Sequence, residues 1–454
     1  LVTGSHVLPV LDGLDELPDE AQAKVIDALN LSLGDGDQLI LTSRTREFRE
    51  AVAATGDVLT SSATLAALPL EPDVVADYLR AGVPRVRAGA WRQVFAELDG
   101  DAPWAVLAEV TATPLGVWLL RTVYTAPGAD PAELADHGRF PHASALRSHL
   151  FDRLAAALIA TRPPAGKPYG DDPQEQLLPR RSYDADDVER WLGFLAGFLT
   201  EKAKTRDLAW WLLTTAVFNP PGAPFSWGTQ NYIPGYYDNY PAPPGWAEAN
   251  LVTIKLTLPG RVGALCRALA IGLSVALAGG ALVAGFIGLL SGGWRVGVAV
   301  GTSFAVTFAL PLALKDWAEI PVSTADPTTP TTSWRAARTA ARFHRWVGVL
   351  AGGVTSALAF GVAFGWMPGL LIALPAGALA GRGIGFLTQY EDAWPKYTAV
   401  ARRLARVHGF PRDLIGFLDD AHRLGLLRIV GPIYQFRHAE YHDHLAGRLL
   451  YRDP

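Results

Sequence analysis

Near its start the chain carries the apolar run Val7-Leu8-Pro9-Val10-Leu11, followed at once by Asp12-Gly13-Leu14-Asp15-Glu16. A second apolar run, Gln38-Leu39-Ile40-Leu41-Thr42-Ser43, ends next to Arg44. Short apolar runs of this kind are typical of buried parallel strands. The residues between them have a helical apolar pattern that ends at Gly34-Asp35-Gly36-Asp37. The first 45 residues therefore predict a strand, a helix and a second strand, with both strands in one sheet.

Charged side chains follow both predicted strands, at the sheet edge where α/β folds bind nucleotides. There Asp12 can help to hold Mg²⁺ against phosphates, and the acidic pair Asp15 and Glu16 can orient or deprotonate an attacking water. Arg44 can bind a terminal phosphate through two N–H groups. A surface acidic turn and an exposed arginine are the alternative for either feature alone. The ordered pair across one strand–helix–strand unit favours the phosphate site.

These two segments resemble the Walker B and sensor 1 motifs of NACHT-domain NTPases, signalling ATPases of the STAND class that are related to NOD-like receptors. The resemblance implies a P-loop-type nucleotide-binding core with ATP or ADP and Mg²⁺ as cofactors. It also implies roles for four residues: Asp12 as the Mg²⁺-linked carboxylate, Asp15 and Glu16 as the acidic pair for hydrolysis, and Arg44 as the sensor 1 arginine.

Two further segments resemble motifs of the same family. Ala112-Thr113-Pro114-Leu115-Gly116-Val117 is similar to the helical-domain motif whose proline, here Pro114, packs against the adenine. The segment from Tyr434 to His442 resembles the winged-helix end, where a histidine contacts the β-phosphate of ADP in the resting state. The matching histidine is His438. On its own, His438 could instead cap a helix, and a zinc pair with His442 lacks a supporting carboxylate pattern.

One motif of the family is missing. The loop G-x-x-x-x-G-K-[ST], which cradles the phosphates, occurs nowhere in the sequence. In the family this loop precedes Walker B, and the chain begins at Leu1 without an initiator methionine. We therefore expect an N-terminally truncated product that binds nucleotide poorly or not at all, which leaves open whether it hydrolyses ATP. A degenerate pseudo-ATPase is the alternative.

Three long stretches lack charged residues: 268–290, 296–314, and 346–381, the last interrupted by Met367-Pro368-Gly369. A membrane helix needs roughly 20 apolar residues. The stretches therefore predict a four-helix transmembrane region, residues 264–390, built as two hairpins. Buried helices of a large soluble domain are the alternative. Tryptophans near the ends of the stretches are typical of an aromatic belt.

Basic residues flank these stretches, and we therefore expect a multi-pass cell-membrane protein with both termini in the cytoplasm. The flanking basic residues are Lys255, Arg261, Arg267, Lys315, Arg335, Arg338, Arg342, Arg345, Arg382, Lys396, Arg402 and Arg403. No acidic residue or histidine lies within a predicted span, so nothing marks a proton or ion pathway. The spans are interpreted as an anchor.

The rest of the chain is predicted to be mostly helical. Residues 411–450 indicate a helix, a small hairpin and a second helix, which is a winged-helix pattern. Residues 186–218 indicate another helical segment, whose aromatic stripe we interpret as core packing. Stretches 163–181, 218–246 and 321–333 are rich in Pro, Gly or Thr and are predicted to be irregular. The predicted domains are 1–70 (partial nucleotide-binding core), 71–162 (helical domain), 163–263 (helical segment with an aromatic loop), 264–390 (transmembrane region) and 393–454 (winged-helix-like domain).

Composition limits the function class. The 454 residues are enough for several domains, and a net charge of −4 provides no basic field for nucleic acid. The single cysteine, Cys266, excludes a disulfide framework and a cysteine-based metal site. The prediction is a membrane-anchored, nucleotide-binding switch that signals by oligomerisation, with a role in defence by analogy. A scaffold without nucleotide chemistry and a transporter or channel component are the alternatives.

Overall fold

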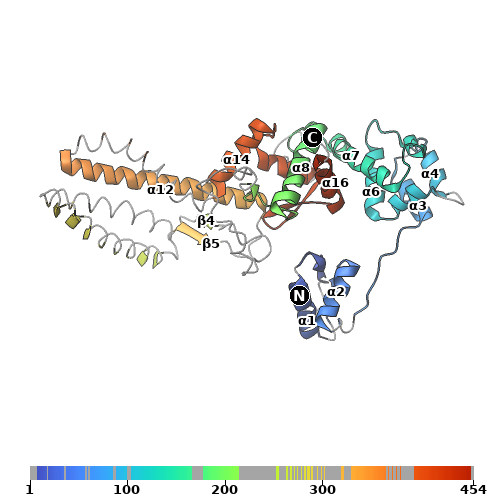
Figure 1. The fold of residues 1–454 in the computed structure, drawn as a ribbon, viewed down its shortest axis with the longest axis horizontal. Helices are drawn as coiled ribbons and strands as arrows, with labels where there is room; N and C mark the ends of the chain where they lie inside the picture. Colours follow the sequence, from blue (N-terminus) through green and yellow to red (C-terminus); the bar gives the residue numbers. More distant parts are fainter. Residues whose placement is uncertain are drawn as a thin grey trace. The chain divides into compact units, whose positions relative to one another are not determined.

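The chain is mostly helical in a computed structural model (Figure 1). The described residues are 8–17, 19–34, 37–56, 59, 62–84, 88–99, 104–165, 177–213, 252–254, 318–321, 329–364 and 393–450, with short pieces or single positions between 262 and 301 and between 367 and 379. The chain divides into two compact units. The first comprises Leu1–Ala81 with Glu97–Val117, and the second comprises Gly82–Ala96 with Trp118–Pro454.

The first unit opens with the predicted strand, helix and strand. Strands β1 (Val10–Leu11) and β2 (Ile40–Leu41) are parallel and hydrogen-bonded, with Val10 opposite Ile40. Helix α1 (Asp19–Ser32) connects them, and α2 (Thr45–Thr55) follows β2. The prediction of two strands in one sheet is therefore confirmed.

The burial of these strands was predicted wrongly. Val10, Leu11 and Ile40 are 58%, 41% and 46% exposed. The local core consists of Leu14 with residues of α1 and α2, and Leu41 is the strand residue that packs on it. A parallel strand is buried on both sides only where helices cover both faces of the sheet. Within the described residues, the core lies on the face to which Leu41 contributes.

The predicted helical region between residues 72 and 162 is confirmed as a series of short helices. Its longest member, α7, is buried along one side by Leu146, Leu150 and Leu154. The elements are α3 (Pro72–Gly82), α4 (Arg92–Asp99), α5 (Ala105–Thr111), α6 (Pro114–Thr125), η3 (Pro131–Ala135) and α7 (Ala143–Thr161).

The C-terminal end of the second unit forms the predicted helix, hairpin and helix. The hairpin is antiparallel and pairs Leu427 with Phe436. Its elements are α15 (Leu414–Leu424), β6 (Leu427–Val430), β7 (Ile433–Phe436) and α16 (Ala439–Leu450), preceded by α14 (Ala393–Val407).

A third strand joins this hairpin from far away in the sequence. Strand β3 (Asp207–Leu208) pairs with β7, so the sheet order is β3-β7-β6. Helix α8 (Ala185–Phe198), which precedes β3, packs extensively against α16. We refer to α8, β3, α14, α15, β6, β7 and α16 together as the C-terminal module. Its members come from two segments, 185–208 and 393–450, which the predicted domain boundaries place in different domains.

The segment that supplies β3 is not the continuous helix predicted over 186–218. Helix α8 passes into one π-helical turn, η5 (Leu199–Ala203), and the backbone then turns at Lys204, whose φ is +53°. The left-handed conformation of Lys204 ends the helix and lets the chain enter β3. The aromatic stripe of this segment is core packing, as predicted, because Trp191, Trp210 and Trp211 are buried.

A long helix, α12 (Pro330–Phe364), extends from the C-terminal module. Its first turn is held there by a 3.0 Å hydrogen bond from Trp210 Nε1 to Ser333 Oγ. The prediction of an irregular stretch up to residue 333 is wrong at its end. Thr329 caps the helix by accepting a hydrogen bond from the Thr332 N–H, and Pro330 occupies the first helical position, where its missing N–H costs little.

Two short strands flank the first predicted pair of spans. Strand β4 (Val252–Ile254) pairs antiparallel with β5 (Glu319–Pro321), with Thr253 opposite Ile320. Antiparallel partners lie about 5 Å apart. The two ends of the segment 255–318 are therefore held together.

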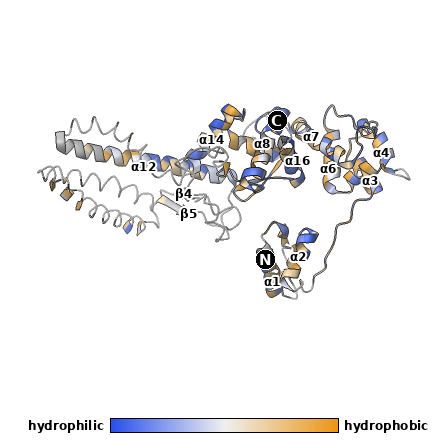
Figure 2. Cartoon of the chain, viewed as in Figure 1, coloured by the Kyte–Doolittle hydropathy of each residue, from blue (hydrophilic) through white to orange (hydrophobic). Residues whose placement is uncertain are grey.

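Most of the predicted transmembrane region lies outside the described residues. This applies to 268–290, 296–314 and 365–381 apart from single positions and short pieces, and also to the predicted loop 218–246. Among the residues that the structure describes, no single helix has both the length and the apolar composition to cross a membrane; α5 and α6 meet both criteria only as a pair bent by 106°. Figure 2 shows hydrophilic positions along the first half of α12.

Candidate functional site

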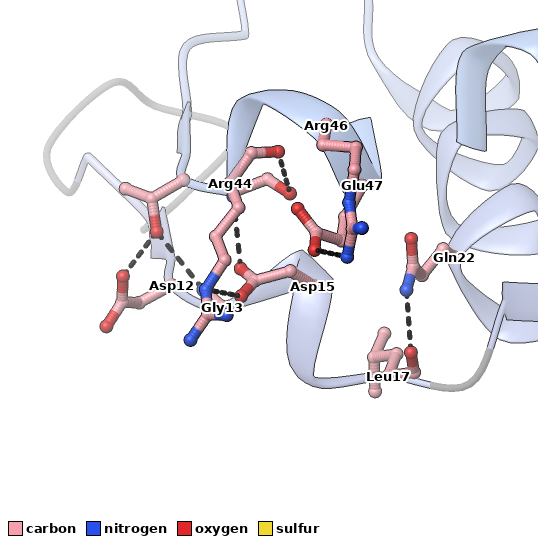
Figure 3. A network of polar contacts seen from close by, with 10 residues as sticks. Asp12, Gly13, Asp15, Leu17, Gln22, Arg44, Arg46 and Glu47 are labelled. Carbon is pink, nitrogen blue, oxygen red and sulfur yellow. Dashed lines mark hydrogen bonds and ion pairs between the residues drawn. The ribbon is translucent and has the colours of Figure 1, made fainter. Parts of the chain in front are cut away.

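The ends of β1 and β2 are joined by a polar network that includes Asp12, Gly13, Asp15 and Arg44 (Figure 3). Thr42 connects the first two of these. The Thr42 hydroxyl donates a hydrogen bond to Asp12 Oδ1 and accepts one of 3.1 Å from the Gly13 N–H. The Thr42 carbonyl accepts a further 3.0 Å hydrogen bond from the Leu14 N–H. Thr42 therefore fixes the turn that carries the Asp12 carboxylate.

Gly13 is needed in this turn for its backbone conformation. Its φ of +84° and ψ of +44° lie in the left-handed region, which an L side chain disfavours. The turn leads into η1 (Leu14–Glu16), whose first residue, Leu14, is buried in the local core. Gly13 thus lets the chain reverse direction between an exposed carboxylate, Asp12, and a core residue.

Asp15 and Arg44 form an ion pair between the two strand ends. Arg44 Nε lies 3.1 Å from Asp15 Oδ2, and the Arg44 backbone N–H donates a 3.3 Å hydrogen bond to Asp15 Oδ1. The Asp15 side chain is 13% exposed, whereas that of Arg44 is 63% exposed. Arg44 is also the residue before α2, so Asp15 lies close to the N-terminus of a helix, where a negative charge is stabilised.

The neighbouring polar groups support the turn or lie on the surface. Gln22 on α1 is buried and donates a 2.7 Å hydrogen bond to the Leu17 carbonyl, which fixes the end of η1. Arg46 and Glu47 pair with each other at 2.8 Å on the first turn of α2 (Figure 3). The hydrogen bond from Arg46 lowers the pKa of the Glu47 carboxyl.

Asp12 is the group at this edge best placed to meet a cation. It is exposed, and its second carboxylate oxygen, Oδ2, has no protein partner among the described residues. No group of three or more His, Cys, Asp or Glu side chains in the described part of the chain is arranged to hold a metal. One carboxylate fits Mg²⁺, which binds through one or two carboxylates together with water and phosphate oxygens. The side chain of Glu16 lies outside the described part.

Pro114 occupies the first position of α6 and is exposed. Thr113 caps this helix through a 3.2 Å hydrogen bond from the Gly116 N–H to its hydroxyl. An ideal Cβ built on Gly116 would lie 1.7 Å from the Val110 carbonyl oxygen, so α5 and α6 can approach each other this closely only at a glycine. Helix capping by Thr113 and the close approach at Gly116 therefore explain the residues around Pro114 without a bound nucleotide.

His438, in the second unit, lies between β7 and α16, and its ring contacts that of Trp118 in a tilted arrangement at a centroid distance of 5.0 Å. Its Nε2 is buried without a hydrogen-bond partner among the described residues. Burial lowers the pKa of His438, and the nearby Arg437 and Arg428 lower it further. At neutral pH His438 is therefore an uncharged imidazole with an unsatisfied nitrogen, which is costly unless a ligand or water contacts it.

Two arginines near Gly425, Arg162 and Arg437, were not singled out from the sequence. A Cβ on Gly425 would lie 3.1 Å from Arg162 Nη1 and 3.6 Å from Arg437 Nη1, so the two guanidinium groups flank this glycine. Burial lowers the pKa of Arg162, and Arg437 lowers it further. Arg162 follows α7 and donates to the Leu424 carbonyl at 2.9 Å. Its neighbours lie over 260 residues away in sequence, so no local pattern signals this basic cluster.

The structure thus brings Asp12, Asp15 and Arg44 together at one sheet edge, as predicted. Pro114 and His438 lie on other elements. Comparison with protein families, with curated proteins and with solved structures finds no match to this chain. The resemblance to NACHT-domain NTPases therefore rests on the motifs alone.

Proposed function

We propose that the chain is part of a membrane-anchored, nucleotide-dependent switch of the NACHT type. The observation that supports this best is the pair of contacts across the strand ends, Thr42 to Asp12 and Arg44 to Asp15. Walker B chemistry needs a carboxylate at one strand end and a phosphate-sensing group at the next. In this structure carboxylates and a guanidinium lie at the ends of parallel, paired strands, which supports the proposal.

In the proposed site Asp12 holds Mg²⁺ through its free oxygen while Thr42 fixes the other. Asp15 and Glu16 position the water that attacks the terminal phosphate. A terminal phosphate competes with Asp15 for the exposed Arg44 guanidinium, which binds phosphate through two N–H groups. The loop that would cradle the phosphates is not in this sequence. The residues at the strand ends would therefore contact a nucleotide from one side only.

We further propose that the C-terminal module is a winged helix with an insertion. The order β3-β7-β6, with α8 before β3 and with α14 and α15 between β3 and β6, supports this assignment. The chain between β3 and α14 would then be an insertion into one domain. His438, with its unsatisfied Nε2, would contact the β-phosphate of ADP and hold the resting state.

The insertion is proposed to anchor the protein in a cell membrane through two helical hairpins, with both termini in the cytoplasm. The β4–β5 pair supports this, because it joins the two ends of the segment 255–318. A segment that leaves and returns at one place crosses a bilayer an even number of times. Exchange of ADP for ATP would free the winged helix and permit oligomerisation. A scaffold without nucleotide chemistry is the second candidate, favoured by the missing phosphate loop.

The decisive experiment uses the protein translated from its own start codon. A G-x-x-x-x-G-K-[ST] sequence between that codon and Leu1 supports the switch, and an unrelated sequence there favours the scaffold. Binding of fluorescent ADP is then measured with and without Mg²⁺. Asp12→Asn should weaken Mg²⁺-dependent binding by about tenfold or more. The matched control is Asp27→Asn, an exposed carboxylate on α1, which should bind like the wild type. Wild-type protein that binds no nucleotide, or Asp12→Asn that binds as well as Asp27→Asn, contradicts the proposal.

A further inference from the structure

The exposed residues of α12 lie along one face of the helix and change in character along it. The face begins with Arg335 and Arg342, and Arg345 adjoins it. It continues with Trp346, Leu350 and Val354, which are 67%, 59% and 44% exposed. Residues spaced by three or four positions share a face of a helix, so the change from charged to apolar occurs along a single line. The opposite face, which includes Ala340, Val347 and Ala351, is buried.

Among the residues that the structure describes, no acidic side chain pairs with the arginines of this face. The sequence of α12 contains four arginines and no acidic residue. Arg338 lies over the ring of Trp334, at 5.4 Å from its centroid. Arg335, Arg342 and Arg345 form no ion pair with any residue in the described part of the chain. Three cations thus point outward just before an exposed tryptophan and two exposed aliphatic side chains.

This sequence of charge, indole and aliphatic side chains matches the profile of a membrane surface. Basic side chains lie at the level of anionic headgroups, tryptophan lies at the interface, and aliphatic side chains lie in the hydrocarbon. A nucleic acid or an acidic protein would be attracted by the arginines but would leave Leu350 and Val354 in water. The sequence continues without a charge from Trp346 to residue 381, which again favours lipid.

We infer that Arg342, Arg345 and Trp346 bind the headgroups of anionic phospholipids, and that α12 passes from the protein into the bilayer at Trp346. This rests on the membrane anchorage proposed above and adds to it a preference for a lipid class. An apolar anchor alone does not distinguish neutral from anionic lipids. The arginines do, because each cation near an anionic surface strengthens binding by about fivefold.

The test compares vesicles of pure phosphatidylcholine with vesicles in which part of the lipid is phosphatidylglycerol. The full chain, kept in solution by a mild detergent, is titrated with each of the two lipid preparations at low salt. The affinity of the chain for each preparation is measured. Wild-type protein should bind phosphatidylglycerol more tightly, and high salt should remove the difference because exposed charges are screened. In the double variant Arg342→Gln/Arg345→Gln, the ratio of the two affinities should be about 25-fold smaller than in wild type, because each of the two arginines contributes about fivefold.

The matched control is Arg49→Gln/Arg92→Gln, which removes two exposed arginines from α2 and α4, far in sequence from the predicted spans. It should keep the wild-type preference to within about twofold, since its charges are not part of this face. Equal affinity of wild-type protein for the two lipids, or an equal loss in the control, overturns the inference. Polyglutamate serves as a model of an acidic protein. If it competes fully with phosphatidylglycerol, and if it binds the Trp346→Ala variant as tightly as wild type, the inference is also overturned and the face is assigned to an acidic protein.

Flotation with phosphatidylcholine vesicles separates this inference from the anchorage on which it rests. A chain that floats with neutral vesicles but shows no preference for phosphatidylglycerol keeps the anchor and loses the headgroup site. A chain that floats with neither kind of vesicle loses both. All variants change exposed side chains, and circular dichroism of each should match that of wild type.

Discussion

Asp15 accepts a hydrogen bond from the backbone N–H of Arg44 and forms an ion pair with its guanidinium group, so a single carboxylate connects the ends of two parallel strands. The aspartate is mostly buried and the arginine mostly exposed. The pair therefore has one partner that the protein covers and one that a ligand can reach. A phosphate that reaches Arg44 can replace the carboxylate without unfolding the turn that Thr42 and Gly13 hold in place.

Replacing Thr42 by valine should destabilise the first unit. The substitution keeps the shape but removes the hydroxyl that bonds Asp12 and the Gly13 N–H. Loss of two hydrogen bonds at a half-buried position predicts a decrease of about 1–2 kcal/mol in the free energy of unfolding, measured by urea denaturation. Thr42→Ser keeps the hydroxyl and should be close to wild type. A valine variant as stable as the serine variant would show that the network contributes nothing.

A side chain at Gly13 should be more costly than one at another turn glycine. The φ of Gly13 is +84°, so Gly13→Ala should cost about 1–2 kcal/mol through backbone strain. The control is Gly89→Ala, since Gly89 lies in a turn with open space around its Cβ position and no positive φ. Thermal unfolding of the two variants checks this, and equal stability would contradict the left-handed turn.

Gly116→Ala should be among the most destabilising glycine substitutions in the chain. The added methyl group would overlap the Val110 carbonyl oxygen, which belongs to backbone and cannot rotate away. Overpacking of this kind costs about 1–3 kcal/mol or more. The matched control is Gly447→Ala in α16, where the Cβ has open space and should add up to about 1 kcal/mol of helix stability. Urea denaturation of both variants gives the two values, and a Gly116→Ala variant as stable as wild type would be inconsistent with the close approach of α5 and α6.

Titration of Glu189 should make the C-terminal module less stable at pH 8 than at pH 5.5. Burial raises the pKa of the Glu189 carboxyl to about 7, which outweighs the attraction of Arg448 at 3.3 Å, and the carboxylates of Asp152 and Asp186 add to the increase. Glutamate in an unfolded chain titrates near pH 4.3. Between these two values the native state keeps a proton that the unfolded state has lost, so stability falls as the pH rises through 7.

Glu189→Gln checks this pH dependence. The glutamine stays neutral, so the stability of the variant should change less between pH 5.5 and 8 than that of wild type. The difference should be on the order of 1–2 kcal/mol in the free energy of unfolding, and melting temperatures at the two pH values report it. The control is Glu440→Gln, which neutralises an exposed carboxylate on α16 and should keep the pH dependence of wild type. Identical pH profiles for wild type and Glu189→Gln would exclude Glu189 as the titrating group.

His438→Ala should weaken the retention of ADP and raise the basal activity of the protein translated from its own start codon. The substitution removes the buried Nε2 that has no protein partner among the described residues, and with it the proposed phosphate contact. The control is His408→Gln, which replaces an exposed histidine whose ring contacts that of Phe194 at a tilt. Unchanged ADP dissociation in His438→Ala would refute the role of His438, whatever the fate of the Asp12 site.

The parts of the fold that were predicted correctly are those with a local signal. The apolar runs that end at Asp12 and at Arg44 predict paired strands, because a strand–helix–strand crossover leaves little choice of topology. The hairpin of β6 and β7 follows in the same way from alternation around a turn. Even so, strands only two residues long do not reveal which face is covered, and the exposure of Val10 and Ile40 was missed.

Contacts between distant segments could not be predicted in this way. Strand β3 has two residues and no periodicity, and its partner Gln435, whose side chain donates to Asp207 at 2.6 Å, lies 228 positions away. The cluster of Arg162 and Arg437 depends on the same long-range assembly. Thr42 was within the predicted motif, but a threonine after a strand carries no sign that its hydroxyl will bind Asp12.

The unbroken course of α12 has a mechanical consequence. The helix has 35 residues and is about 50 Å long at 1.5 Å per residue. Its base is clamped to the β3 region through Trp210 and Ser333. A rod fixed in this way acts as a lever arm, so a tilt of about 5° at the clamp displaces the far end by about 4–5 Å. Small rotations of the domain at its base therefore become displacements of several ångströms at the far end of the helix.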